Sequence, residues 1–103
     1  MGIPLALPIE IPVAKLEDFC KRNDINKLSL FGSVLRNDFT PQSDVDLLVE
    51  FLEGKTPGLA IVDLQDELSR MLGREVDLRT AAELSRFFRD RVLSEAVAIY
   101  VKN

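Results

Sequence analysis

The chain contains no histidine, no tryptophan and a single cysteine among its 103 residues. The lack of histidine excludes a Ser-His-Asp or Cys-His mechanism, a histidine general base and the usual zinc sites. Any catalysis must therefore depend on carboxylates. Cys20 falls on the apolar face of a predicted helix, which favours a small core residue over a reactive thiol. Because one cysteine provides no disulfide framework, we expect a cytoplasmic protein.

Basic residues are also in deficit, since 13 Lys and Arg stand against 17 Asp and Glu and the formal net charge is −4. They are scattered singly, so the electrostatic footprint of a nucleic-acid-binding surface is missing. The apolar start of the chain has no basic segment and includes three prolines within residues 1–12. It also reaches Glu10 too early for a signal peptide or a membrane span. We expect neither direct nucleic-acid binding nor a membrane protein.

The sequence suggests two parts, an extended N-terminal arm over residues 1–11 and one domain over residues 12–103. With 47% hydrophobic residues, the chain can close a single core. The arm could cover a sheet edge or dock on a partner, but local packing is the favoured interpretation.

Periodicity and turn residues predict helices over 12–23, 56–72 and 80–95 and strands over 26–31, 44–52 and 74–79. Residues 34–43 suit a short helical turn followed by a loop. The final stretch AVAIYVKN fits either a closing strand or a last helical turn, and we favour the strand. The apolar face of the last helix is expected to comprise Leu84, Phe87, Phe88 and Val92. This order predicts an α/β (α+β) fold, a small mixed sheet with helices packed on one face.

Two aspartates interrupt a predicted buried strand. Side chains alternate across a strand, so Asp44 and Asp46 point to one face while their apolar neighbours point to the core. The same alternation in the strand over 74–79 turns Asp77 outward. Three carboxylates on one face repel one another unless cations lie among them, and carboxylate oxygens are ligands that Mg²⁺ prefers.

An Asp-x-Asp pair is a weak signal on its own, but a Gly-Ser turn precedes it. Gly32 and Ser33 end a predicted strand, where glycine allows close approach of a ligand and free N–H groups attract phosphate. A triphosphate could lie between this turn and the metal ions. Arg36 either contacts phosphate or acceptor or is simply exposed, and Ser43 either touches the nucleotide or caps the turn before the strand.

At these positions the chain resembles the nucleotidyltransferase superfamily of DNA polymerase beta. More narrowly, LFGSVLRNDFTPQSDVDLLVEF, REVDLRT and RDRVLSEAVAIY are similar to the minimal nucleotidyltransferases (MNT), which are antitoxins encoded beside HEPN toxins. The similarity runs from about residue 26 to the end. Members often carry Arg-x-Arg-Gly-Asp after the Gly-Ser, whereas this chain has Val34-Leu35-Arg36-Asn37-Asp38, a departure that bears only on finer acceptor contacts.

The resemblance implies that Asp44, Asp46 and Asp77 bind two Mg²⁺ ions and that Gly32 and Ser33 hold the β and γ phosphates of ATP. It also implies transfer of AMP to a tyrosine hydroxyl of a cognate HEPN ribonuclease toxin, which is thereby neutralised. We predict a two-metal phosphoryl transfer, with in-line attack on the α-phosphorus and release of pyrophosphate. Asp77 is the expected general base or its metal-bound equivalent.

Three alternatives stand beside this hypothesis. A non-catalytic antitoxin could inhibit the toxin by binding alone, although the presence of all three aspartates argues against it. A small-molecule nucleotidyltransferase would resemble the enzymes that adenylylate aminoglycosides, but those carry an added helical domain. If the aspartates were merely solvated charges, the Gly-Ser turn would have no explanation.

Overall fold

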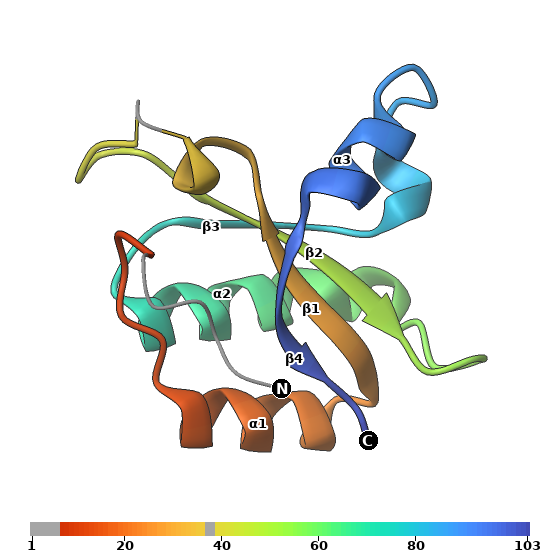
Figure 1. The fold of residues 1–103 in the computed structure, drawn as a ribbon. Coiled ribbons are helices and arrows are strands. Elements are labelled where there is room, and N and C mark those ends of the chain that lie inside the picture. The colour runs from red at the N-terminus through yellow and green to blue at the C-terminus, as the bar shows by residue number, and fades with distance from the viewer. Residues whose placement is uncertain (1–6, 37–38) are drawn as a thin grey trace.

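The computed structural model describes residues 7–36 and 39–103. Within that part of the chain, four strands form one mixed sheet in the order β3-β2-β1-β4 (Figure 1). The strands are β1 (Ile25–Phe31), β2 (Val45–Phe51), β3 (Val76–Arg79) and β4 (Val97–Val101). β1 pairs antiparallel with both β2 and β4, whereas β2 and β3 are parallel. β4 confirms the strand favoured for the C-terminal stretch.

Two helices cover one face of this sheet. α1 (Val13–Arg22) contacts β1 and β4, and α2 (Ile61–Leu72) contacts β3. The core lies between helices and strands, where Leu16, Phe19 and Leu68 are each at most 1% exposed. The mixed sheet and its packed helices confirm the predicted fold class.

Cys20 lies fully buried in the same core. Burial raises the pKa of its thiol to about 12, and the nearby charge of Glu17 adds to the effect. A thiol with so high a pKa is protonated at neutral pH and is a poor nucleophile. This confirms the prediction that Cys20 is a core residue.

The C-terminal end of α2 agrees with the sequence prediction, but its N-terminal end does not. Gly73 adopts a left-handed conformation with φ of +67° and ends the helix, as expected. The predicted start at Thr56 is wrong, because a 3₁₀ turn, η2 (Gly58–Ala60), precedes α2 and the α-helix begins at Ile61. Gly58 itself has φ of +58°, which is incompatible with a continuous right-handed helix from residue 56.

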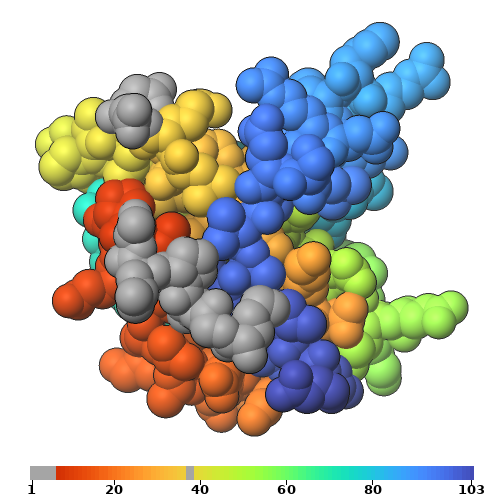
Figure 2. All heavy atoms as spheres, viewed as in Figure 1, coloured from red at the N-terminus to blue at the C-terminus, as the bar shows by residue number. Residues whose placement is uncertain are grey.

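The segment after β3 is less helical than its pattern predicts. A 3₁₀ turn, η3 (Ala81–Glu83), is followed by extended backbone at Leu84, and α3 comprises only Arg89–Glu95. Leu84 is buried, but Phe87 is 89% exposed and Phe88 is 48% exposed. The prediction of one continuous apolar face through these residues is therefore wrong. In Figure 1, α3 lies on the side of the sheet remote from α1 and α2, and in Figure 2 the segment projects from the body.

Part of the predicted arm lies on the core. Leu7, Ile9 and Ile11 are half-buried and pack against the core cluster, as local packing would require. Residues 1–6 lie outside the described residues, as do Asn37 and Asp38 of the departure from the family pattern. In the described part of the chain, no helix is long and apolar enough to cross a membrane.

Candidate active site

Asp46 and Asp77 are directly paired neighbours on the parallel strands β2 and β3. Their side chains therefore share one face of the sheet. The alternate residues of both strands, Val45, Leu47, Val76 and Leu78, are buried on the other face. The register thus places the two carboxylates next to each other on the face that points away from α1 and α2.

Asp44 lies immediately before β2 and is exposed. Its charge acts on Asp46. Partial burial raises the pKa of Asp46, the charges of Asp77 and Asp44 raise it further, and Arg36 and Arg79 oppose the rise. Asp44 and Asp77 thus both act electrostatically on Asp46, and a cation placed beside Asp46 would relieve this repulsion.

Gly32 lies against the Asp46 carboxylate. A Cβ at Gly32 would overlap Asp46 Oδ2, and the residue has φ of +75°, which L side chains rarely adopt. The contact follows from the sheet, because Phe31 at the end of β1 pairs with Asp46. Two motifs that are separate in the sequence therefore meet in space, and only glycine fits between them.

The Gly-Ser turn is itself the start of a 3₁₀ turn, η1 (Gly32–Leu35), rather than a loop ahead of a later helical turn. Ser33 is half-buried within it, and its carbonyl accepts the N–H of Arg36 at 2.9 Å. This contact orients the backbone that carries Arg36, whose side chain is exposed. Contacts of Ser33 and Arg36 with phosphate stay predictions.

The loop that leads into Asp44 is held by polar contacts. Ser43 Oγ accepts the N–H of Thr40 at 2.9 Å, so the observed contact of Ser43 is that of a turn residue. A role for Ser43 in nucleotide binding stays a prediction. Arg74 stacks over the Phe39 ring at 5.1 Å and donates to the Pro41 carbonyl at 3.4 Å, which ties this loop to the turn before β3.

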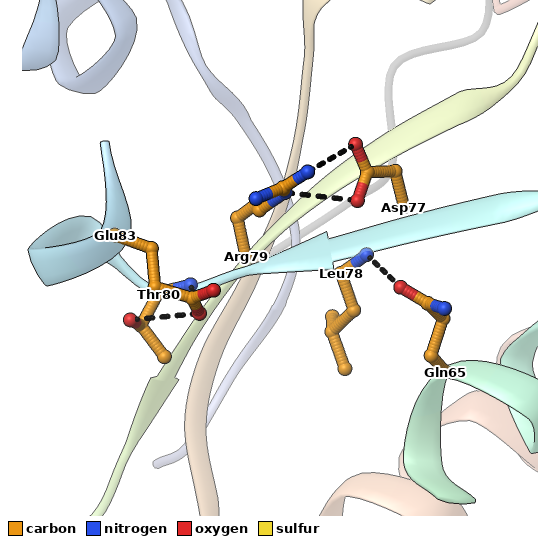
Figure 3. A network of polar contacts seen from close by, with 6 residues as sticks. All are labelled: Gln65, Asp77, Leu78, Arg79, Thr80 and Glu83. Atoms are coloured by element: carbon orange, nitrogen blue, oxygen red, sulfur yellow. Dashed lines mark hydrogen bonds and ion pairs between the residues drawn. The ribbon is translucent and has the colours of Figure 1, made fainter. Parts of the chain in front are cut away.

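Side chains of α2 fix β3 in place. Gln65 Oε1 accepts the N–H of Leu78 at 3.0 Å, and Ser69 Oγ accepts the N–H of Val76 at 3.0 Å. Figure 3 shows the first of these bonds beneath the Asp77 carboxylate. Asp77 lies between the two bonded residues, Val76 and Leu78. These bonds to α2 therefore fix the backbone position from which the Asp77 side chain extends.

Asp77 is engaged by Arg79, two residues along the same strand. Arg79 Nε donates to Asp77 Oδ1 at 2.9 Å and Nη2 donates to Oδ2 at 3.3 Å (Figure 3). Arg79 was not among the site residues predicted from the sequence. Its signal was the same alternation that places Asp77, because residues 77 and 79 of a strand point to one face.

The donor set fits a hard divalent cation. The carboxylates supply only oxygen ligands, and the missing side chain of Gly32 makes room for the carboxylate of Asp46 itself. Over residues 7–36 and 39–103, however, no three acidic, cysteine or histidine side chains are placed to hold one ion as they stand. Both oxygens of Asp77 are instead bound by Arg79.

A glycine turn against paired carboxylates on a mixed sheet is the arrangement predicted for a phosphoryl-transfer site. Residues 13–99 match the family described as "Nucleotidyltransferase domain", and the chain belongs to this family. The family predicted from the motifs is therefore confirmed.

Two relatives with similar sequences have names that refer to protein adenylylation. The chain is 32% identical over 90 residues to the protein adenylyltransferase MntA of Thermococcus cleftensis, with 86% of this chain and 89% of that protein covered. It is 42% identical over 78 residues to a candidate protein adenylyltransferase of Methanocaldococcus jannaschii, MJ0435, with 76% and 83% covered.

Solved structures share the fold. A candidate minimal nucleotidyltransferase is 35% identical with a TM-score of 0.68, and 82% of this chain and 86% of that chain are covered. A toxin–antitoxin complex with AMP-PNP gives a TM-score of 0.71 at 20% identity, with 90% and 76% covered. A tri-AMPylated Shewanella oneidensis HEPN toxin in complex with its MNT antitoxin gives 0.62 at 20% identity, with 87% and 70% covered.

Proposed function

We propose that this chain is an antitoxin that transfers AMP from ATP to a tyrosine hydroxyl of a cognate HEPN ribonuclease toxin and so neutralises it. The observation that carries the proposal is the contact between Gly32 and Asp46, with Asp77 in register beside them. The contact joins the turn predicted to hold phosphate to the carboxylates predicted to hold metal ions. The relatives named protein adenylyltransferase support the reaction type.

In this proposal Asp44, Asp46 and Asp77 hold two Mg²⁺ ions. When bound, these ions would neutralise charge on the triphosphate and acidify the acceptor hydroxyl. The carboxylates of Asp46 and Asp77 are already crowded, so binding of cations removes a repulsion that exists in the free protein.

Backbone and side chains of the Gly-Ser turn hold the nucleotide. Gly32 lets the β and γ phosphates approach the backbone beside Asp46, and the hydroxyl of Ser33 donates to them. Arg36 supplies positive charge on the same face, since its charge already acts on Asp46. Ser43 is the remaining predicted contact, near the start of β2.

The chemical step is an in-line displacement. The acceptor oxygen forms a bond to the α-phosphorus, and the bond from this phosphorus to the bridging oxygen of pyrophosphate breaks. The hydroxyl proton passes to a carboxylate, for which Asp77 is the predicted acceptor. The products are AMP-tyrosine and pyrophosphate.

The partner brings its own recognition surface to this reaction. We propose a hetero-oligomer of this chain with the HEPN protein, in keeping with the complexes that related antitoxins form with their toxins. The reaction would take place in the cytoplasm, where the buried, unpaired Cys20 meets no oxidising environment.

Transfer can be tested with α-labelled ATP, Mg²⁺ and the HEPN protein encoded beside this chain. The wild type should label a tyrosine of that protein, Asp44→Asn should not, and Asp66→Asn on the exposed side of α2 should label normally. If wild type and Asp44→Asn silence the toxin equally without any label, the chain is a binding-only antitoxin. Labelling of a small molecule but not of the protein would favour a small-molecule nucleotidyltransferase.

A further inference from the structure

Arg79 is a basic side chain on the carboxylate face that the family motif does not account for. It lies on β3 in register with Leu48 of β2, one pleat beyond the pair Asp46 and Asp77. Its side chain is 46% exposed and that of Asp77 is 37% exposed, so the ion pair between them faces solvent. The guanidinium therefore has room to leave Asp77 without disturbing the core.

The acidic residue next along the chain does not compete for Arg79. Glu83 Oε1 accepts the N–H of Thr80 at 3.0 Å and its hydroxyl at 3.1 Å, which is the capping box that opens η3 (Figure 3). The hydrogen bonds and charge of Asp77, and the more distant charges of Glu83 and Asp46, raise the pKa of Arg79. Arg79 thus stays charged and is directed to Asp77.

The contact between Arg79 and Asp77 places a cationic side chain on a predicted metal ligand. The guanidinium occupies one lone pair on each oxygen of Asp77 and places a positive charge where a divalent cation would bind, so the two compete for this carboxylate. When cations take the oxygens of Asp77, Arg79 loses its partner and faces a more positive site. The strong anion then expected on this face is the triphosphate, which a guanidinium binds through two parallel hydrogen bonds.

We propose that Arg79 is a nucleotide-binding residue that holds Asp77 in the free protein and exchanges it for the triphosphate when divalent ions bind. The inference rests on the proposed function, because it requires a nucleotide on this face. Arg79 would then have opposite effects on the binding of cations and of nucleotide. The side chain competes with cations for Asp77, and it attracts the nucleotide once they are bound.

The opposite signs make the proposal testable by binding alone. Exposed ion pairs contribute little, so Arg79→Gln should bind Mn²⁺ without nucleotide about two- to fivefold more tightly than the wild type. Loss of a charged, two-pronged contact should weaken binding of AMP-PNP in the presence of Mg²⁺ by about tenfold or more. Isothermal titration calorimetry measures both affinities on the full chain.

Arg91→Gln is the matched control. Arg91 forms a more exposed ion pair, with Glu95 at 3.1 Å, and lies on α3 rather than on a carboxylate-bearing strand. Both affinities should match the wild type in this variant. Arg79→Lys keeps the positive charge but cannot form two parallel hydrogen bonds to a phosphate. Its AMP-PNP affinity should therefore fall between those of the wild type and Arg79→Gln.

An unchanged affinity of Arg79→Gln for either Mn²⁺ or AMP-PNP overturns the exchange. Weaker binding of both also overturns it, since Arg79 would then only position Asp77. These outcomes are separable from failure of the proposed function. If the wild type binds AMP-PNP but never labels the HEPN protein, AMP transfer fails while the behaviour of Arg79 can still follow the expected pattern.

Discussion

Strands β2 and β3 present two faces of opposite character. Toward α1 and α2 they turn Val45, Leu47, Val76 and Leu78, none of which is more than 4% exposed. Toward the other side they turn Asp46, Asp77 and Arg79, whose charges act on one another. The same two strands carry the apolar and the charged side chains. Packing of the apolar face therefore fixes the positions of the charges on the other face. Substitutions on the two faces should therefore separate stability from activity.

The largest expected effect is on the charged face. Asp46→Asn keeps the shape of the side chain but removes the charge that would hold a cation. AMP transfer to the HEPN protein should fall by about a thousandfold or more, because such ions stabilise the transition state by several kcal/mol. Glu50→Gln, an exposed residue on the same face of β2, should keep wild-type activity. Equal loss in both variants would contradict a specific role for Asp46.

The apolar face should give the next largest effect, on stability. Leu47 is fully buried, so Leu47→Ala should lower the free energy of unfolding by about 2–5 kcal/mol. Leu59→Ala makes the same chemical change at a side chain that is 93% exposed, and should stay within about 0.5 kcal/mol of the wild type. Urea denaturation of the three proteins measures the difference, and similar midpoints for the two variants would be inconsistent with this core.

Gly32 should affect both stability and activity. Its left-handed backbone conformation bears on stability, and its contact with Asp46 bears on the site. Gly32→Ala should cost about 1–2 kcal/mol in backbone strain and lower AMP transfer on the order of tenfold to a hundredfold. Gly54 has the same φ of +75° but open space around it, so Gly54→Ala should share the strain and keep the activity. Thermal midpoints of the two variants measure the backbone strain, and their initial rates of AMP transfer measure the importance of the contact with Asp46. Full activity in Gly32→Ala would mean that the carboxylate can move without loss.

The smallest effect expected is a pH dependence of stability. The raised pKa of Asp46 means that the folded state binds its proton more tightly than the unfolded chain does. Relative to Asp46→Asn, the wild type should therefore lose stability as pH rises from the ordinary value of 3.8 through the raised one. Thermal denaturation without divalent ions, from acidic to neutral pH, follows the difference. A wild type that gains stability relative to Asp46→Asn over that range would reverse the sign.

Much of the charged face could be predicted from strand alternation alone. Asp46 and Asp77 stand outward because their neighbours Val45 and Val76 are apolar, and period-two patterning is a strong signal in buried strands. The Gly-Ser turn was also predicted, as a place where a phosphate could approach the backbone closely, but its contact with the Asp46 carboxylate was not. The parallel register that makes the aspartates direct neighbours depends on long-range packing and was not encoded locally.

Other features could not be predicted because they depend on choices between partners. Arg79 has two acidic neighbours, Asp77 and Glu83, and it binds Asp77 while the local capping box with Thr80 engages Glu83. The exposure of Phe87 follows from the extended backbone at Leu84, which turns the later residues out of helical phase. Apolar residues at helical spacing predict an apolar face. They do not show whether another part of the protein packs against that face.

The bonds from α2 to β3 have a consequence for the behaviour of the protein in concentrated solution. An outermost strand with unsatisfied amides is a template on which strands of other molecules can add. On β3 the amides of Val76 and Leu78 already donate to Ser69 and Gln65. This margin of the sheet is therefore closed to intermolecular strand addition, and Gln65→Leu together with Ser69→Ala would reopen it to aggregation.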